Sequence, residues 1–429
     1  CHFGSSRNLS DIATMLPHEQ KMFDWVNRNG GEATKCCSGV RPDHVRGLFA
    51  AEDLADGELA CVIPEALALG GATADNVLNA AMNAELQKWG VREPQEREVY
   101  RTMGAVVLQY LVGMAVLRGD PASASPYIAS LPEPPETINL WSKEQQVLGE
   151  AMLGRNHLSM YKPLVSAITN AAANGCKGKF DAVKQPPPTE QEVFDSFHFI
   201  LSRLSHMRLI PVADLANAAA PGEATARIMA DGKICAIIAK GEVRKGQELL
   251  IDYNHRDAIT LLASYGFTGG LEHERSMTRL KFDAGPALLR ATGSASARYA
   301  SEGVQLLDEE EAGLHADAFL CARWQQMNEH ELALALNYGW DSGTNSKIDP
   351  AVQSVLAKAE TRGCQALQAT CKVAMDVVHE WEDLADRLPG VAWITAALRA
   401  QVATDRRLLE RVSRRAQKRI DALQKRAVI

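Results

Sequence analysis

Residues 208–267 read RLIPVADLANAAAPGEATARIMADGKICAIIAKGEVRKGQELLIDYNHRDAITLLASYGF, and this stretch decides the fold. Its middle alternates between short apolar runs and turn residues. Asp231-Gly232 separates ARIMA from KICAIIA, and Asp-Gly between two apolar runs is a strong signal for a β-hairpin. Lys245-Gly246 then turns the chain into QELLIDY, which we expect to be a strand. A short helical pattern, DAITLLASYGF, closes the stretch.

Polar residues stand at the two ends of this predicted β unit. Asp214 and Asn217 come early in the stretch, and Tyr253 ends the last apolar run. A phenol at the end of a strand is held by a rigid element, as a catalytic group needs to be. The alternative is a core tyrosine whose hydroxyl is satisfied by a backbone partner.

The motifs in this stretch resemble a known family. LIPVADLAN and GQELLIDYN…LLASYGF resemble the two signature motifs of SET-domain methyltransferases, closest to the subgroup typified by the Rubisco large-subunit lysine methyltransferase. RGLFA at residues 46–50, followed by ADGELACVIP, is similar to the opening motif of that family. The resemblance covers most of the chain, more weakly in its middle and C-terminal third.

The resemblance implies an α+β chain of three parts. Residues 1–39 form an N-terminal leader and helix, and residues 40–275 form a β-rich SET domain with an α-helical insert at about 73–190. Residues 285–429 form an all-α C-terminal domain that presents a protein substrate. In the family, the C-terminal segment of the SET domain threads through a loop, against the general rule for connections.

Periodicity in the sequence predicts elements consistent with this division. Residues 40–69 contain apolar runs of strand type, and residues 177–190 read as an exposed polar loop with three prolines. A helix start is expected at Ser142, which Glu144 and Gln145 follow. The predicted helices span Pro17–Asn29, Glu96–Arg118, Glu192–Leu204, 299–338, 350–387 and 391–427.

Composition limits the possible partners and the compartment. The net charge of −7 argues against a nucleic-acid-binding surface overall. Nine scattered cysteines without a CxxC pair indicate a reducing, intracellular compartment, with cytoplasm, nucleus and plastid not distinguished. The chain begins at Cys1 rather than Met, so we expect a fragment or a processed form. The apolar run Thr102–Leu117 is shorter than the ~20 residues of a membrane span, which predicts a buried helix and no membrane.

The histidines and cysteines show no spacing typical of a metal site, so we expect no metal. Methyl transfer to an amine requires positioning more than acid–base groups. The amine, with an ordinary pKa of ~10.4, must be neutral, and burial beside a sulfonium favours that form. A site for this chemistry can therefore lack catalytic clusters of Cys, His and carboxylates.

The resemblance assigns roles to individual residues. Tyr253 matches the catalytic tyrosine, and Tyr265 matches a second aromatic residue near the cofactor and the lysine channel. Arg203 matches the arginine that contacts the carboxylate of S-adenosylmethionine, which suits a guanidinium; an ordinary surface arginine at a helix end is the alternative. Asn217 matches a cofactor-contacting asparagine, and Asp214 belongs to the same segment.

Four further positions complete the cofactor assignment. His44, Val45 and Arg46 fall where the family's backbone lines the cofactor. Ala218 stands where the family has a histidine, and this departure leaves two readings open. If the family uses the backbone there, cofactor binding survives; if it uses the imidazole, the chain binds cofactor poorly or not at all.

The expected function is therefore S-adenosylmethionine-dependent methylation of a lysine in a protein substrate. The first alternative is a non-catalytic protein-interaction module with the SET fold, which Ala218 favours. The second is a protein-histidine methyltransferase. Members of that kind carry a tryptophan before the motif aspartate, and this chain has Ala213 there, as lysine-directed members do.

Overall fold

The computed structural model describes residues 15–41, 45–70, 75–153, 156–219, 222–253, 258–267, 277–280, 304–307, 322, 326–337, 349–388 and 392–427. The chain divides into two units. Unit 1 comprises the residues up to 256 together with 260–270, and unit 2 comprises 257–259 and the residues from 271 onward.

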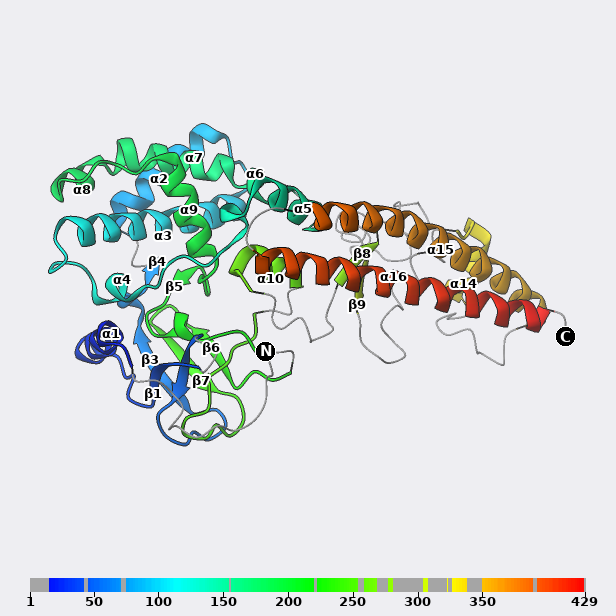
Figure 1. The fold of residues 1–429 in the computed structure, drawn as a ribbon, viewed down its shortest axis with the longest axis horizontal. Coiled ribbons are helices and arrows are strands. Elements are labelled where there is room, and N and C mark those ends of the chain that lie inside the picture. Colours follow the sequence, from blue (N-terminus) through cyan, green and yellow to red (C-terminus); the bar gives the residue numbers. More distant parts are fainter. Residues whose placement is uncertain are drawn as a thin grey trace. The chain divides into compact units, whose positions relative to one another are not determined.

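Three small antiparallel sheets form the β part of unit 1 (Figure 1). The predicted Asp231-Gly232 hairpin is confirmed, because Ala230 pairs with Cys235 across it and Gly232 has a φ of +88°, which glycine adopts without strain. The strand before the opening motif was not predicted. The two-stranded sheets pair β1 (Cys36–Val40) with β2 (Arg46–Ala50), and β4 (Leu69–Gly70) with β5 (Arg208–Leu209). The three-stranded sheet contains β3 (Leu59–Pro64), β7 (Ile234–Ala239) and β6 (Ala226–Ala230) in that order.

The strand predicted after Gly246 is not formed, so this prediction was wrong. The run that leads to Tyr253 is extended but makes only isolated bridges. The Leu249 amide donates to Leu48 O at 2.7 Å, and the Ile251 amide donates to Asn217 O at 2.9 Å. The segment is therefore held between β2 and the chain at Asn217 by a few separate hydrogen bonds on each side instead of a continuous ladder. This placement fixes the residues that precede Tyr253.

Helices of the insert cover the upper part of unit 1 in Figure 1. The predicted helix at Glu96–Arg118 is confirmed as α3, and Ser142 begins α5 by exchanging hydrogen bonds with Gln145. The helices of unit 1 are α1 (Pro17–Arg28), α2 (Asn76–Trp89), α3 (Pro94–Gly119), α4 (Pro126–Ser130), α5 (Lys143–Leu153), α6 (His157–Met160), α7 (Lys162–Asn170), α8 (Lys177–Ala182), α9 (Glu190–Leu201) and α10 (Ala258–Tyr265), with shorter turns η2 (Glu65–Leu67), η4 (Ile138–Leu140), η5 (Ala171–Gly175, a π-helix) and η6 (Ala213–Leu215).

Helix α3 is the one described helix long and apolar enough to cross a membrane by length and composition. Core helices of soluble proteins pass the same test. Val106, Val107, Leu108 and Leu111 of α3 are at most 3 % exposed within the core of unit 1. This packing agrees with the buried helix predicted from its sequence.

The expected polar loop at residues 177–190 is partly wrong, because its first six residues form α8. Phe180 is only 1 % exposed and anchors this short helix in the core. One apolar residue among polar neighbours gives no periodic signal, so tertiary packing decides the structure here. The prolines that follow precede α9, which begins with a capping box between Thr189 and Glu192.

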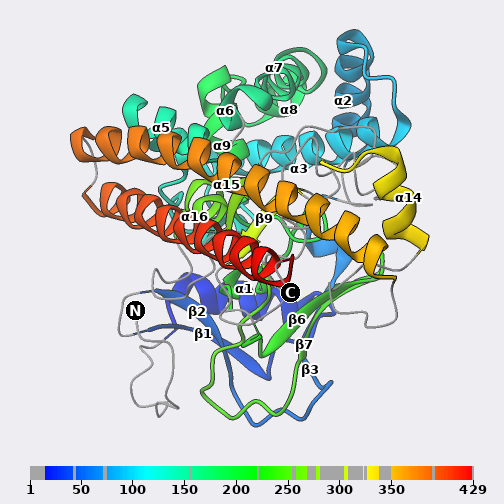
Figure 2. The same cartoon turned by 90° about the vertical axis from the view of Figure 1, so that its right-hand side faces the viewer.

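Unit 2 contains two long helices that pack along each other, α15 (Pro350–Arg387) and α16 (Ala392–Ala427), as Figure 2 shows. Both were predicted at nearly these bounds. The described part also includes α14 (Glu329–Asn337) and a two-stranded sheet of β8 (Met277–Leu280) and β9 (Val304–Leu307). The α+β class is confirmed, but β9 lies in a region expected to be wholly helical.

Candidate active site

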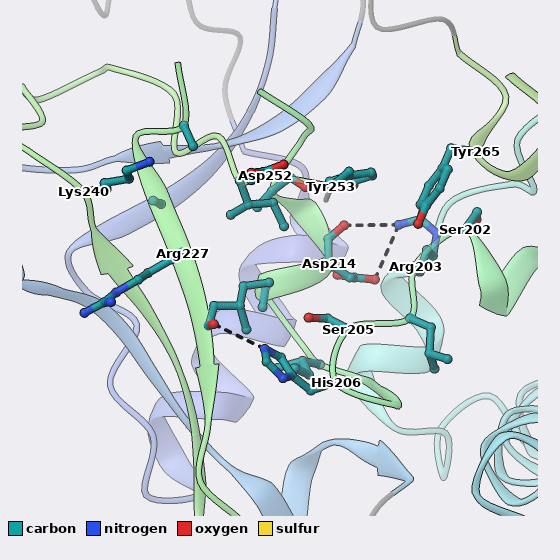
Figure 3. Close-up of a pocket in the computed structure, with 18 residues that line it drawn as sticks. Ser202, Arg203, Ser205, His206, Asp214, Arg227, Lys240, Asp252, Tyr253 and Tyr265 are labelled. Carbon is teal, nitrogen blue, oxygen red and sulfur yellow. Dashed lines mark hydrogen bonds and ion pairs between the residues drawn. The ribbon is translucent and has the colours of Figure 1, made fainter. Parts of the chain in front are cut away.

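Unit 1 contains a cavity of about 510 Å³. The chain that follows α9 contributes Arg203, the turn η6 contributes Asp214, and the segment after Gly246 contributes Tyr253. Tyr265 from α10 completes this side, and strand β6 lines the opposite side (Figure 3). Residues distant in the sequence therefore meet here because α9, η6 and α10 all end or turn at the same place.

Tyr253 is fixed by one hydrogen bond and by two aromatic rings. Its hydroxyl donates to Ala216 O at 3.2 Å, and its ring centroid lies 4.9 Å from that of Tyr265 and 6.0 Å from that of Phe267. Burial raises the pKa of Tyr253 above the usual value for a phenol, and nearby Arg203 offsets only part of this effect. The hydroxyl is therefore protonated at neutral pH, so it can orient a ligand but is unsuited to be a base.

Asp214 connects Arg203 to a buried tyrosine of the insert. The hydroxyl of Tyr127, on α4, donates to Asp214 Oδ2 at 3.1 Å, and Arg203 Nη1 lies 3.5 Å from the same oxygen (Figure 3 shows the Arg203–Asp214 contacts). Burial raises the pKa of Asp214, while Arg203 and Arg46 act in the opposite direction. Tyr127 is fully buried, so this chain of contacts is fixed from within the protein.

The backbone before Asp214 is bent in a rare way. Val212 has a φ of +66° and a ψ of −48°, and the Ala213 amide donates to Pro211 O at 2.7 Å. This combination is a γ-turn with positive φ, which is strained for a β-branched residue. Strain of this kind persists only where the surrounding packing determines it, and here it directs η6 and Asp214 to the cavity.

The guanidinium of Arg203 has unused hydrogen-bonding capacity. Its bonds to Asp214 are long, at 3.4 Å to the carbonyl and 3.5 Å to Oδ2, and its Nε is buried with no hydrogen-bond partner among the described residues. A buried donor without a partner is costly. The Arg203 side chain lines the cavity and is 18 % exposed, so an anionic group such as a carboxylate could pair with the guanidinium there, and the residues present fit the cofactor that the motifs imply.

Asn217 has a different environment from the one expected. Its Nδ2 donates to Arg46 O and to Glu248 Oε1, both at 2.8 Å. Gly47 leaves the space for this arrangement, since a Cβ there would lie 2.4 Å from Glu248 Oε1 and 3.1 Å from Asn217 Nδ2. Asn217 thus joins the opening motif to the later one through the backbone of Arg46, and does not line the cavity.

The structure separates the predicted site residues into three groups. Arg203, Asp214, Tyr253 and Tyr265 meet at the cavity. The predicted site residues that the structure describes but that do not line the cavity are Val45, Arg46, Asn217 and Ala218. His44 lies outside the described residues, as does His255 beside Tyr253.

Two residues that brace the site were not identified from the sequence. Tyr127 lies in the weakly matching insert, and Glu19 on α1 is 1 % exposed and paired with Arg46. The Glu19 carboxylate also accepts a hydrogen bond of 2.6 Å from Ser38. Neither residue follows a motif, and a glutamate in an amphipathic helix normally faces solvent. Their roles follow from tertiary contacts alone.

No protein-family model and no curated protein sequence matches the chain. Solved structures match it in fold. A crystal structure of the SET domain of LSMT bound to lysine and AdoHcy is 16% identical, with a TM-score of 0.59 over 95% of this chain and 93% of that chain. A structure of Rubisco LSMT bound to AdoMet is 15% identical, with a TM-score of 0.57 over 96% and 94%. This chain has the LSMT fold.

The LSMT fold confirms the resemblance that the motifs indicated, at the level of the architecture. The match covers the C-terminal region as well as the SET region, because nearly the whole of both chains is aligned. An identity of about one residue in six establishes the fold and not the activity. The activity therefore has to be argued from Arg203, Asp214 and Tyr253 themselves.

Proposed function

We propose that this protein is a methyltransferase that uses S-adenosylmethionine to methylate a lysine side chain of another protein. One observation carries the proposal. In a cavity of the LSMT fold, a protonated phenol, a second tyrosine ring and an arginine with an unpartnered buried N–H converge. These groups suit a ligand with a carboxylate and an amine acceptor beside it.

When bound, S-adenosylmethionine supplies the methyl group as an electrophilic sulfonium. Arg203 would hold the cofactor carboxylate with its guanidinium, a role for which that group is well suited. Asp214 balances part of the charge of Arg203 and keeps its side chain at the cavity wall. Tyr127 in turn holds Asp214.

Tyr253 would orient the acceptor amine. Its hydrogen is donated to Ala216 O, so the lone pairs of its oxygen are available to accept an amine N–H. The rings of Tyr253 and Tyr265 would lie beside the acceptor, and burial there disfavours its ammonium form. The amine loses its proton to solvent rather than to Tyr253, since the raised pKa keeps that phenol neutral. Positioning then supplies most of the rate enhancement.

A non-catalytic interaction module is the second candidate function, and Ala218 is the observation that favours it. Against it, the backbone around Ala218 is held without an imidazole. The Ala219 amide donates to Ile251 O at 2.8 Å, and Ile251 donates back to Asn217 O at 2.9 Å. A cofactor contact made by this backbone would therefore survive the replacement. The catalytic reading is the better supported of the two.

A transfer assay tests the proposal. The protein is incubated with methyl-labelled S-adenosylmethionine and an extract depleted of small molecules, and the labelled proteins are hydrolysed to amino acids. We expect label in methyllysine, at a rate at least ~10²-fold lower for Tyr253→Phe. Label in methylhistidine would show that the acceptor is a histidine and not the proposed lysine. No transfer by the parent, with cofactor binding intact, would favour the non-catalytic module.

A further inference from the structure

Helix α16 carries an unusual concentration of positive charge. Residues 406–426 hold nine of the 46 Lys and Arg residues of the chain and only two acidic residues. This segment therefore has a net charge of +7, whereas the chain as a whole has −7. The overall charge that argues against a nucleic-acid-binding surface thus conceals one strongly basic element.

Five of these basic residues share one face of the helix. At 100° per residue, they fall within an arc of about 60°, opposite the apolar face that packs in unit 2. We call this face the basic stripe. From first to last it spans 18 residue steps, or about 27 Å at 1.5 Å per step. The basic stripe consists of Arg407, Arg411, Arg414, Lys418 and Lys425.

The basic stripe differs from the structural cations of the same helix. Arg406 and Arg419 lie beside it and bind carboxylates of α15, Glu382 and Glu360 respectively. In the stripe, Arg414 has only a 3.8 Å contact with Glu410 on its own helix, and both side chains are exposed. Lys418 and Lys425 are exposed and have no carboxylate partner among the residues that the structure describes. Arg414, Lys418 and Lys425 are therefore not needed to join α16 to α15.

The side chains near the stripe favour one class of anionic partner. None of the exposed large hydrophobic side chains in the described chain lies between residues 394 and 425. A protein partner normally needs apolar or aromatic anchors, and a membrane surface needs an exposed apolar face. The apolar face of α16 is buried, with Leu409, Val412 and Ala416 at 0 % exposure. A phosphate backbone, in contrast, is bound by cations alone.

We propose that the basic stripe binds the phosphate backbone of double-stranded nucleic acid without reading its sequence. A duplex presents one negative charge per ~1.7 Å, so about 16 phosphates run alongside the stripe. The regular spacing of the cations on a straight helix lets several of them meet phosphates together. This interaction is independent of the proposed methyl transfer, because no residue of the stripe belongs to the cavity.

Fluorescence anisotropy with a labelled 20-base-pair DNA duplex tests the proposal on the full chain. We expect a Kd on the order of 10⁻⁶ M at 50 mM salt, and a slope of about −3 to −4 in log K against log salt concentration, as three or four phosphate contacts require. The variant Arg407→Gln/Arg414→Gln/Lys418→Gln should bind at least ~10-fold more weakly and lose most of the slope.

The matched control changes three exposed cations on α15, in the variant Lys358→Gln/Lys372→Gln/Arg387→Gln. Its net charge equals that of the stripe variant, so it should bind the duplex nearly as well as the parent. Circular dichroism checks that both variants keep their helices. Absence of binding by the parent, or equal losses in the two variants, would overturn the proposal. Equal affinity for polyglutamate or for anionic vesicles would also overturn it, by assigning the stripe to an acidic protein or to a membrane.

Discussion

At the scale of single residues, the candidate site depends on how Arg203, Asp214 and Tyr253 hold one another. The Asp214 side chain is buried and that of Arg203 is partly buried, and their contacts of 3.4–3.5 Å are too long to satisfy the guanidinium. Tyr253 is instead satisfied through Ala216 O. The cavity therefore combines one group with unused capacity and one group that is already oriented.

Removal of the Tyr253 hydroxyl tests its orienting role. In Tyr253→Phe the ring contacts with Tyr265 and Phe267 remain, while the oxygen that would accept the amine N–H is lost. We expect kcat to fall by ~10² or more, with the Kd for S-adenosylmethionine changed less than about threefold. A Phe variant as active as the parent would show that the phenol does not take part.

Tyr127→Phe tests the positioning of Asp214 from the insert. The hydrogen bond from Tyr127 favours the ionised form of Asp214, so its loss raises the pKa of Asp214. We expect the acid limb of kcat/KM to move to higher pH, and the Kd for S-adenosylmethionine to rise about three- to tenfold. Tyr110→Phe is the matched control. Tyr110 is a buried tyrosine of α3 whose ring lies at a tilt to that of Phe199, with centroids 5.3 Å apart, and it has no hydrogen bond to Asp214 among the described residues. A shift of the acid limb of the same size in both variants would show that Tyr127 contributes only through packing.

The sequence identified the residues at the cavity whose neighbours form motifs. Arg203, Asp214, Tyr253 and Tyr265 could be predicted because they lie in or beside short matching segments. Tyr127 and Glu19 could not, since a buried hydroxyl or carboxylate acquires its partner only through tertiary packing. The γ-turn at Val212 was also beyond prediction, because a β-branched residue does not favour positive φ.

At the scale of elements, helix α9 joins the site to a buried pair of histidines. His198 on α9 and His157 on α6 lie with their ring centroids 5.8 Å apart, and both are at most 2 % exposed. Burial, together with His157, lowers the pKa of His198 to about 3. The rings of Phe194, Phe197 and Tyr161 also pack around it. No carboxylate among these described neighbours would stabilise a protonated ring.

This burial predicts a pH-dependent stability. The unfolded chain binds a proton at His198 below pH ~6.5, whereas the folded chain does so only near pH 3. The favourable contribution of the neutral ring is thus complete above pH ~6.5 and is lost as the pH falls toward 3. Between pH 7 and 4.5 it amounts to about 2–3 kcal/mol. Urea unfolding of His198→Leu should show a pH dependence smaller by this amount, while His206→Leu, at an exposed histidine, should match the parent. Parallel curves for His198→Leu and the parent would contradict the pKa assignment.

Elements with a clear period were predicted well, and the others were not. Helices α3, α9, α15 and α16 have repeating apolar faces long enough to define them. The chain before Tyr253 was misread as a strand, because its composition is that of a strand while its partners offer only single bridges. Helix α8 and strand β9 are short and depend on the contacts they make, so no local pattern distinguishes them from loop or helix.

At the scale of the whole molecule, the proposed function requires a cofactor site and a surface that recognises the protein substrate, and we assign these to different units. Every described residue of the cavity lies in unit 1, whose core is continuous from β2 to α9. The described part of unit 2 consists mainly of long helices and contributes no residue to the cavity. Substrate recognition is the role that remains for it under the proposed function.

Truncation of the chain at Ala284 tests this division. We expect the shortened chain to fold, as judged by circular dichroism, and to bind S-adenosylmethionine within about threefold of the parent. Activity on the whole protein substrate should fall mainly through a higher KM, because remote binding energy acts chiefly on substrate affinity. Activity on a short lysine peptide should fall much less. Equal losses on protein and peptide would assign unit 2 a structural role.

Calorimetric titration of the full chain with S-adenosylmethionine tests the central claim most directly. We predict saturable binding at one site, at least ~10-fold weaker in Arg203→Ala and strengthened in Ala218→His. Arg244→Ala is the matched control, because that side chain is exposed and does not line the cavity, and it should bind like the parent. Absence of saturable heat from both the parent and Ala218→His, or an equal loss in Arg244→Ala and Arg203→Ala, would contradict the assignment of this cavity to the cofactor.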